Sequence, residues 1–335
     1  MNQPNLFETL TTLFPGKQIR KSHVIQALWS GYGELARYYI DNEPVILKHI
    51  DLQAYASGCI VHPRGWSSTF SHQRKIASYQ NERQFYCDYA HLTDHHCRVP
   101  RLLSSRSDND GLWLLLEDLD AAGFDQRHGL HLTKYVTPQQ RIKHVRDVIR
   151  WLAYFHGRFI QPQQTSLWPQ GNYWHLATRP DEFNAMPDSP LKEAAHELDK
   201  RLRACQYQTI IHGDAKLANF CFHQAPDHDP NIAAVDFQYC GTGVGIIDVV
   251  YLLSSAFDSD DLTRYSEGLI AEYFDHLTIA IGASLSEHQL TELRQQWCQL
   301  VCVAWADFER FLVGWSPQHA KRNAFSDEQT NLAIY

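Results

Sequence analysis

The 335-residue sequence has no apolar run long enough to cross a bilayer and no surplus of basic residues. A membrane-spanning helix needs about 20 consecutive apolar residues, and the N-terminus lacks the basic flank and apolar stretch of a secretory signal. With 30 lysines and arginines against 38 aspartates and glutamates, the net charge is −8. A surface for nucleic acid or anionic lipid needs the opposite excess. We therefore expect a cytoplasmic protein with neither a membrane nor a nucleic-acid partner.

The cysteines show no pairing pattern. None of the eight belongs to a C-x-x-C pair and several lie within apolar runs, so reduced thiols are the simplest expectation. One cluster at 87–97 combines two cysteines with three histidines, which are zinc-binding residue types. Its spacing fits no common zinc site, so a polar connection between a helix and a strand is the favoured interpretation.

Several common motifs are absent. There is no G-x-x-x-x-G-K-[ST] loop, which excludes a P-loop nucleotidase on motif grounds, and no G-x-S-x-G hydrolase elbow. The glycines at 241, 243 and 245 resemble a dinucleotide fingerprint, but the third comes one residue early and no βαβ unit follows. We interpret this segment as a turn.

The apolar pattern changes along the chain. Short strands alternate with turns in the first third, with predicted strands around a glycine turn at 31–33, at 45–50 and at 112–119. Helical spacing follows at 72–91 and 139–160, and Ser286 to Gln289 has the form of a capping box before an apolar stripe at 290–308. These patterns predict an α+β protein with a strand-rich N-terminal lobe, 1–118, and a mainly helical C-terminal lobe, 119–335.

A run at 212–219 and a later aspartate carry the strongest chemical signal. His212, Asp214 and Asn219 have the H-x-D-x-x-x-x-N spacing of a kinase catalytic loop, and Asp236 closes a short apolar strand 17 residues after Asn219. Phosphoryl transfer needs one carboxylate to accept the hydroxyl proton, and an amide with a second carboxylate to hold magnesium. The order and spacing predict Asp214 as the base and Asn219 with Asp236 as Mg²⁺ ligands. Lys216, two residues after the base, either contacts the γ-phosphate or is a solvated loop lysine.

Lys48 is an ammonium group in the middle of the apolar strand at 45–50. Burying it unpaired would be costly, so it needs a phosphate or a carboxylate. Glu82 on the next helix is the natural partner, with Glu34 and Glu43 as rivals. Such a pair orients the lysine toward nucleotide phosphates.

Two further segments suit a nucleotide. Gly31 and Gly33 lie upstream of Lys48 and permit a turn whose amides approach phosphates, although hairpins use the same residues. Glu117, Asp118 and Leu119 follow an apolar strand, where their backbone groups would contact adenine.

With these residues placed, the sequence resembles the ecdysteroid-kinase-like (choline-kinase-like) family, within the aminoglycoside phosphotransferase and choline kinase branch of the protein-kinase-like superfamily. The resemblance spans most of residues 25 to 280. The matching segments are Ile46-Leu47-Lys48, Ser78 to Tyr86, Leu115 to Leu119, His212 to Asn219, and Val235 to Gln238. It implies a bilobal protein-kinase-like fold and the ATP- and Mg²⁺-dependent phosphorylation of a hydroxyl group of a small molecule. It also implies that Asp248 braces the catalytic loop.

The acceptor and two alternative functions stay open. The aromatic residues Trp168, Tyr173, Trp174, Trp305 and Trp315, with Asp307 and Glu309, either form a pocket for a cationic or flat ligand or pack helices together. A non-catalytic nucleotide-binding or scaffold protein is one alternative function. A protein kinase is a lesser one, because Asp248 follows Asp236 by only twelve residues and leaves no room for a long activation loop.

Overall fold

The computed structural model describes residues 6–28, 31–52, 68–108, 111–127, 137–225 and 227–335. Trp29 and Ser30, which begin the predicted glycine turn, lie outside these ranges. The chain divides into two compact units, the first containing residues 1–91 and 100–125, the second 92–99 and 126–335. The sequence prediction placed the division after Asp118, whereas the first unit continues to Asp125.

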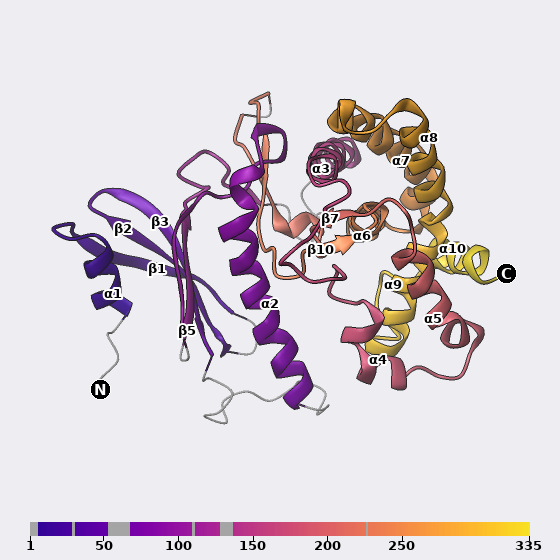
Figure 1. Ribbon diagram of the computed structural model, residues 1–335, viewed down its shortest axis with the longest axis horizontal. Coiled ribbons are helices and arrows are strands. Elements are labelled where there is room, and N and C mark those ends of the chain that lie inside the picture. Colours follow the sequence, from indigo (N-terminus) through magenta and orange to yellow (C-terminus); the bar gives the residue numbers. More distant parts are fainter. Residues whose placement is uncertain (1–5, 29–30, 53–67, 109–110, 128–136, 226) are drawn as a thin grey trace. The chain divides into compact units, whose positions relative to one another are not determined.

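The first unit is a five-stranded sheet with two helices, as Figure 1 labels them. The elements are α1 (Leu6–Leu13), β1 (Ile19–Ala27), β2 (Gly33–Ile40), β3 (Glu43–Asp51), α2 (Ser68–Asp88), β4 (Leu102–Ser107) and β5 (Gly111–Glu117). The sheet is antiparallel throughout and has the order β1-β2-β3-β5-β4. The strands predicted at 45–50 and 112–119 and the helix predicted at 72–91 are thus confirmed as β3, β5 and α2.

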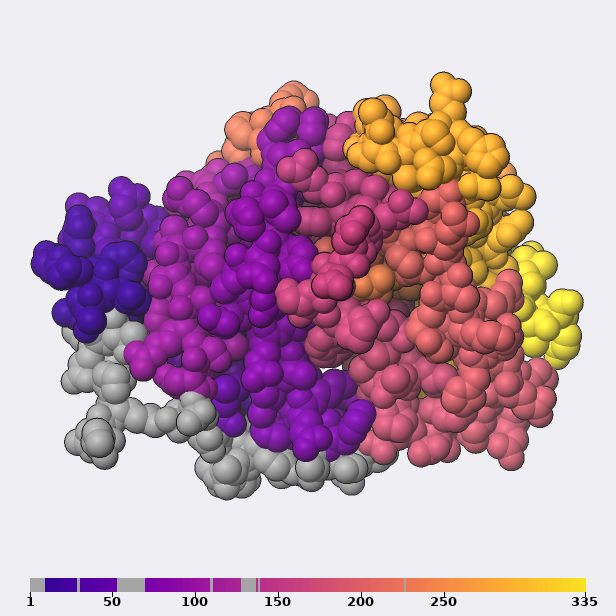
Figure 2. Space-filling view, viewed as in Figure 1, coloured from indigo at the N-terminus to yellow at the C-terminus, as the bar shows by residue number. Residues whose placement is uncertain are grey.

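The two faces of this sheet have different partners. Val45 and Leu47 of β3 belong to a buried cluster that contains Leu10 of α1. Successive residues of a strand point to opposite faces, so Lys48 lies on the other face, where its ammonium contacts α2. Figure 1 shows α1 and α2 on opposite sides of the sheet. In Figure 2, α2 (purple) lies at the surface on the face shown, and Gln80 is among its exposed residues.

The second unit is mainly helical and contains two small sheets. Its helices are α3 (Pro138–Arg158), α4 (Pro180–Asn184), α5 (Pro190–Arg203), α6 (Ile246–Ala256), α7 (Ser259–Ile281), α8 (Glu287–Gln299), α9 (Val301–Trp315) and α10 (Ala324–Ile334). Its strands are β6 (Gln126–Arg127), β7 (Thr209–Ile211), β8 (Phe220–Phe222), β9 (Ile232–Ala234) and β10 (Gly241–Gly243). The antiparallel pair β10-β7 forms one sheet, and β6-β8-β9 forms the other. With the strand-rich first unit, the architecture is α+β, as predicted.

Helix α3 is central to the second unit. Thr137 and Gln140 form a capping box at its start, and Pro138 occupies the first turn, where its missing N–H costs no hydrogen bond. Trp151 is fully buried and donates its indole N–H to the carbonyl of Arg98. This bond ties the short segment 92–99 to the helical unit.

The apolar stripe at 290–308 is divided between two helices. The predicted capping box of Ser286 and Gln289 is confirmed at the start of α8. Leu300 lies between the two helices with φ −93° and ψ 0°, and its N–H donates to the carbonyl of Trp297, three residues earlier. Helix α9 begins at Val301, so the stripe is divided between two helices. Within the described parts of the chain, no helix combines the length and apolarity needed to cross a membrane.

Candidate active site

The segment that carries the kinase-like motif follows β7 and precedes β8. Strand β7 is fully buried and pairs with β10, which fixes the start of the segment. Residues 217–219 form a single 3₁₀ turn that leads directly into β8. The loop is therefore held at both ends by short buried strands.

Asp248 of α6 fixes the backbone at the start of this loop. Its fully buried carboxylate accepts the N–H of His212 (2.6 Å to Oδ2) and the N–H of Gly213 (2.9 Å to Oδ1). His156 Nε2 lies 3.1 Å from Oδ2, and His156 Nδ1 lies 2.8 Å from the hydroxyl of Tyr273. Burial raises the pKa of Tyr273 well above its usual value, so the hydroxyl stays protonated and donates to His156. Two backbone N–H groups and the His156 ring thus contact the buried carboxylate, and the Tyr273 hydroxyl completes the network through His156.

Gly213 permits the loop to turn. Its φ of +77° lies in the left-handed region, and a Cβ here would be 2.0 Å from the carbonyl oxygen of Tyr239. Any side chain at this position would force the loop away from Tyr239. The carbonyl of Gly213 also accepts the N–H of Tyr173 at 3.2 Å, which joins the 161–190 segment to the loop at 212–219.

The carboxylate of Asp214 has one engaged oxygen and one open oxygen. Oδ2 accepts from Lys216 Nζ at 2.8 Å and from Asn219 Nδ2 at 3.1 Å. Oδ1 is buried, and no group in the described parts of the chain donates to it. Buried polar atoms are normally satisfied, and exceptions call for a functional explanation. The open oxygen is where an incoming hydroxyl can donate its proton.

Lys216 remains positively charged in this setting. Burial lowers its pKa, but the carboxylates of Asp214 and Asp236 outweigh burial, so the pKa is raised above its ordinary value. The resulting ammonium lies beside the Asp214 carboxylate and is partly exposed. It is therefore a fixed positive charge next to the candidate base.

The structure brings Asn219 and Asp236 together through the hairpin of β8 and β9. The carbonyl of Asn219 accepts the N–H of Val235 at 2.9 Å, and Asp236 is the next residue. His212 adds a second link, because its Nε2 contacts the carbonyl of Val235 at 3.0 Å while its Nδ1 accepts the N–H of Asp214. This network assigns the proton of His212 to Nε2.

The side chains of Asn219 and Asp236 suit a magnesium ion. The amide nitrogen of Asn219 is committed to Asp214, which leaves its amide oxygen for a ligand. Asp236 has a φ of +70°, a strained conformation that is common at functional sites, and its Oδ1 accepts from Gln238 at 2.6 Å. Mg²⁺ prefers oxygen ligands and typically takes one or two carboxylates with water and substrate phosphates. The donor set fits that pattern.

The alternative zinc hypothesis has no support from the geometry. Among the described residues, which include 87–97, no three His, Cys, Asp or Glu side chains are arranged to hold a metal ion. His96 instead stacks on Tyr154 of α3, with ring centroids 4.3 Å apart.

In the first unit, Lys48 and Glu82 form a buried ion pair. Lys48 Nζ lies 2.6 Å from Glu82 Oε2, and their side chains are 8% and 2% exposed. The ring of Tyr79 lies 5.7 Å from the ammonium. Of the two rival carboxylates, Glu34 pairs with Lys21 and Glu43 is exposed at the start of β3. The pair therefore forms because Lys48 points to the side of β3 that faces α2, and Glu82 lies on the face of α2 turned toward the sheet.

The predicted phosphate turn and the 117–119 segment also lie in this unit. Gly31 and Gly33 both have positive φ values, and a Cβ on Gly33 would be 2.0 Å from the carbonyl oxygen of His49. The Asp118 carboxylate is bound by the guanidinium of Arg37, so its side chain is structural. The Glu117 N–H donates to Arg101, and the Leu119 carbonyl accepts from Phe124.

The sequence matches the model of one protein family. That family is described as the phosphotransferase enzyme family, APH, and the match covers residues 24–282. The chain belongs to the phosphotransferase enzyme family. A search of curated proteins found no significant match.

Solved structures in this family's fold resemble the chain over most of its length. The GDP complex of aminoglycoside 2'-phosphotransferase-IIIa is 13% identical with a TM-score of 0.50, covering 98% of this chain and 97% of that one. APH(3'')-Id from Streptomyces rimosus, solved with ADP and streptomycin, is 14% identical (TM-score 0.49; 88% and 98% covered). Plasmodium vivax ethanolamine kinase is 10% identical (TM-score 0.44; 95% and 82% covered). At such identities the likeness concerns the fold alone, an antiparallel sheet followed by a mainly helical region.

Beside Asp214 lies an aromatic wall that the sequence did not fully reveal. The hydroxyl of Tyr173 lies 3.2 Å from that of Tyr251, and their rings meet edge to face. Burial, then the Tyr173 hydroxyl and the Asp214 carboxylate, raise the pKa of Tyr251 well above its usual value. Phe308 of α9 packs against Tyr251 with centroids 5.2 Å apart. Tyr173 was predicted here, whereas Tyr251, three residues after Asp248 on the same helix face, was a readable signal that the prediction omitted.

For Asp307 and Glu309 the contacts favour helix packing over a ligand pocket, the other alternative that the sequence left open. Asp307 is buried against Arg310, three residues along α9, and also accepts the indole N–H of Trp174. Glu309 is buried against Arg322 and the hydroxyl of Ser326. Each acid is thus paired with an arginine of the same unit.

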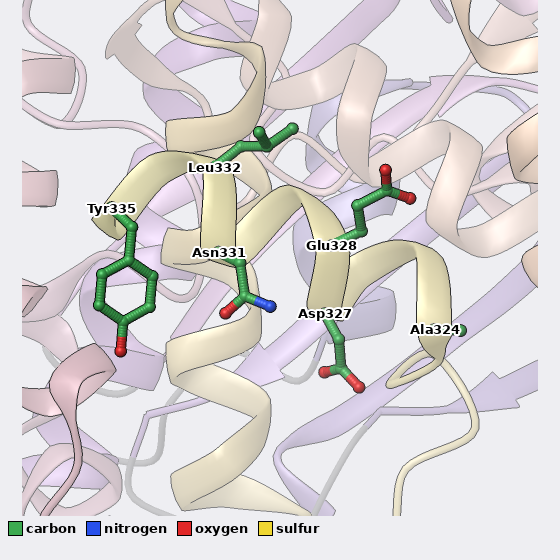
Figure 3. Close-up of a pocket in the computed structure, with 6 residues that line it drawn as sticks. All are labelled: Ala324, Asp327, Glu328, Asn331, Leu332 and Tyr335. Atoms are coloured by element: carbon green, nitrogen blue, oxygen red, sulfur yellow. The ribbon is translucent and has the colours of Figure 1, made fainter.

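Two of the predicted tryptophans pack against neighbouring rings. Trp305 is 1% exposed and packs on Phe325, and Trp315 stacks on Phe311. A surface hollow of about 610 Å³ near the C-terminus is lined by α10 and Tyr335 (Figure 3). None of its six lining residues belongs to the candidate site.

We predict that Asp248→Asn destabilises the protein by about 2–4 kcal/mol. The two oxygens of the carboxylate accept the N–H groups of His212 and Gly213, whereas an amide has only one acceptor oxygen. The NH₂ group of the asparagine would then face one of these N–H donors. Urea denaturation followed by fluorescence measures the change. The matched control is Asp275→Asn, an exposed aspartate paired with Arg294, which should change stability by less than about 0.5 kcal/mol. Equal stabilities of the two variants would contradict the bracing role.

Proposed function

We propose that this phosphotransferase is an ATP- and Mg²⁺-dependent kinase that moves the γ-phosphate to a hydroxyl of a small molecule. The observation that carries the proposal is the Asp214 carboxylate, with Oδ2 held by Lys216 and Asn219 and Oδ1 buried and open. A general base needs one such oxygen within reach of the hydroxyl proton.

In the proposed reaction the acceptor oxygen attacks the γ-phosphorus and its proton passes to Asp214 Oδ1. The new O–P bond forms as the bond to the β-phosphate oxygen breaks, and ADP leaves with that electron pair. Magnesium held by Asn219 and Asp236 would supply positive charge against the phosphates. Lys216, fixed beside Asp214, adds a further charge on the side of the transferred group.

We assign nucleotide contacts to the first unit. The Glu82 carboxylate orients the Lys48 ammonium toward the phosphates, and the turn at Gly31 and Gly33 offers backbone N–H groups. Backbone groups at 117–119 would contact the base of the nucleotide, because the Asp118 side chain is already bound to Arg37. The related 2'-phosphotransferase was solved with GDP, so GTP is to be assayed beside ATP.

Among subgroups of the family, we propose the ecdysteroid-kinase-like one, on the motifs at Lys48, Glu82, 115–119 and 235–238. The segment after Asp236 favours a small acceptor over a protein. Strand β10 and the first residues of α6 occupy 241–248, which leaves no loop that could dock a peptide. The non-catalytic alternative predicts nucleotide binding without turnover.

Asp214→Asn should lower kcat by about 10²–10⁴-fold, because the amide cannot accept the hydroxyl proton. The affinity for Mg-ATP should change by less than about twofold, since the base does not bind the nucleotide. Mass spectrometry of phosphorylated products from a metabolite extract with ATP and Mg²⁺ measures transfer. Asp260→Asn, exposed at the start of α7, is the control and should retain full activity. Full activity of Asp214→Asn would refute the assignment, and no product from the wild-type protein would refute the kinase.

Asp236→Ala should weaken the binding of Mg-ATP by about tenfold or more, a loss of about 1.4 kcal/mol. Calorimetry with Mg²⁺ and with EDTA separates the metal-dependent part of the binding. Asp236→Asn is the matched variant, because asparagine tolerates the left-handed backbone at φ +70° while lacking the charge. Unchanged affinity in both variants would remove Asp236 from the metal site.

A further inference from the structure

A lysine outside every recognised motif lies against Tyr251, and the charge of the candidate base Asp214 acts on it. Lys321 belongs to the loop between α9 and α10, and its Nζ lies 4.1 Å from the ring centroid of Tyr251 and 5.3 Å from that of Phe308. These rings form the aromatic wall next to Asp214. Cation–π contacts of this kind hold an ammonium in position without neutralising it.

The loop that carries Lys321 is anchored on both sides. Arg322 Nε binds Glu309 Oε1 of α9, and a guanidinium nitrogen of Arg322 donates to the carbonyl of Pro317. The next residue, Asn323, forms a capping box with Ser326 at the start of α10. The backbone of Lys321 also donates to His319 Nδ1. Its ammonium is therefore presented by a fixed scaffold.

Lys321 has no anionic partner of its own. Across the described residues, its Nζ makes no hydrogen bond or ion pair, and the two nearby acids, Asp307 and Glu309, are bound to arginines. Burial lowers the pKa of Lys321 to about 7, with Asp214 raising it and Lys216 lowering it. Tyr251 and His319 are the other titratable groups at this position. Keeping an unpaired ammonium partly buried costs folding free energy unless a ligand supplies a negative charge or a hydrogen-bond acceptor.

We propose that Lys321 selects acceptors that carry an anionic group, a carboxylate or a phosphate, close to the hydroxyl that is phosphorylated. The inference rests on the proposed kinase function and deepens it. With the hydroxyl donating to Asp214 Oδ1, an anion on the same molecule would pair with the Lys321 ammonium. An acceptor with an ammonium at that place would meet the like charge of Lys321. Of the carboxylates in the described part of the chain, only that of Asp214 acts on this position. The transfer itself is unchanged, with the hydroxyl proton going to Asp214 and ADP leaving.

The first experiment identifies the charge of the acceptor. A metabolite extract is separated into anion-exchange-bound, cation-exchange-bound and unbound fractions, and each is incubated with the wild-type protein, ATP and Mg²⁺. We expect phosphorylated products from the anion-exchange-bound fraction. Phosphatase treatment of that fraction before the assay abolishes the products if the anion is a phosphomonoester and leaves them if it is a carboxylate. Products from the cationic or unbound fraction alone would overturn the inference but not the kinase. No product from any fraction would overturn both.

The second experiment tests Lys321 itself on the acceptor so found. Lys321→Met keeps the apolar stem and removes the charge, and should raise the KM for the acceptor by about tenfold or more with a smaller change in the KM for ATP. Lys321→Glu should weaken the anionic acceptor further. Lys200→Met, on the exposed face of α5, is the matched control and should leave both KM values unchanged. A rise confined to the KM for ATP would assign Lys321 to the nucleotide and overturn the inference.

Stability separates a binding role from a structural one. The unfolded chain binds a proton on Lys321 up to about pH 10.5, whereas the folded chain releases it near pH 7. Between these pH values the unfolded state binds more protons than the folded state. The free energy of unfolding therefore increases as pH rises from 7 to 10.5, and the destabilisation caused by Lys321 is fully present below pH 7. Lys321→Met should therefore raise Tm at pH 6.5 while it weakens acceptor binding. A lower Tm with a proportionate loss of all activity would show that Lys321 only supports the fold.

Discussion

The rest of the candidate site depends on the hydrogen bonds that the buried carboxylate of Asp248 accepts. It accepts the two backbone N–H groups that set the start of the catalytic loop, and His156 and Tyr273 complete its hydrogen bonds. From that fixed start, Gly213 turns the chain, Asp214 takes its position, and His212 reaches across to the strand that precedes Asp236. A charged group with no solvent contact is tolerable only when all of its partners are in place. The contacts that hold the candidate site in shape are therefore also contacts of the folded core.

Much of this arrangement was readable in the sequence because it depends on local rules. Alternation along β3 predicts that Lys48 faces the side of the sheet opposite Leu47, and helical spacing on α2 predicts Glu82 as a partner. The spacing from His212 to Asn219 and the strand before Asp236 predict the catalytic set. What the sequence could not supply are partners distant along the chain. Nothing near Lys321 indicates that its loop returns to Tyr251. The choice between a ligand pocket and helix packing for Asp307 and Glu309 stayed open because their arginine partners were not considered. Arg310, three residues after Asp307 on one helix, was a detectable signal.

Charge is distributed unevenly around the base. The Asp214 carboxylate raises the pKa of Lys216 and acts in the same direction on Lys321, while the two acids of α9 pair with arginines. Three neighbouring residues of α9 have different partners, because Phe308 packs on Tyr251 while Asp307 and Glu309 pair with arginines. A site lined by aromatic rings and cations has different chemistry from one lined by rings and acids, although the same residue types appear in the sequence.

The hairpin of β8 and β9 has a consequence for how this chain can vary. Its open end, where Asn219 meets Val235, holds the two candidate metal ligands, and both strands are buried along their length. The chain between Phe222 and Ile232 connects the other end, remote from the ligands. The entropic cost of closing a loop increases only slowly with its length. Insertions in this connection therefore leave the strand pairing, and with it the distance between Asn219 and Asp236, unchanged. The distance in sequence between Asn219 and Asp236 is thus free to change across evolution while their separation in space is not.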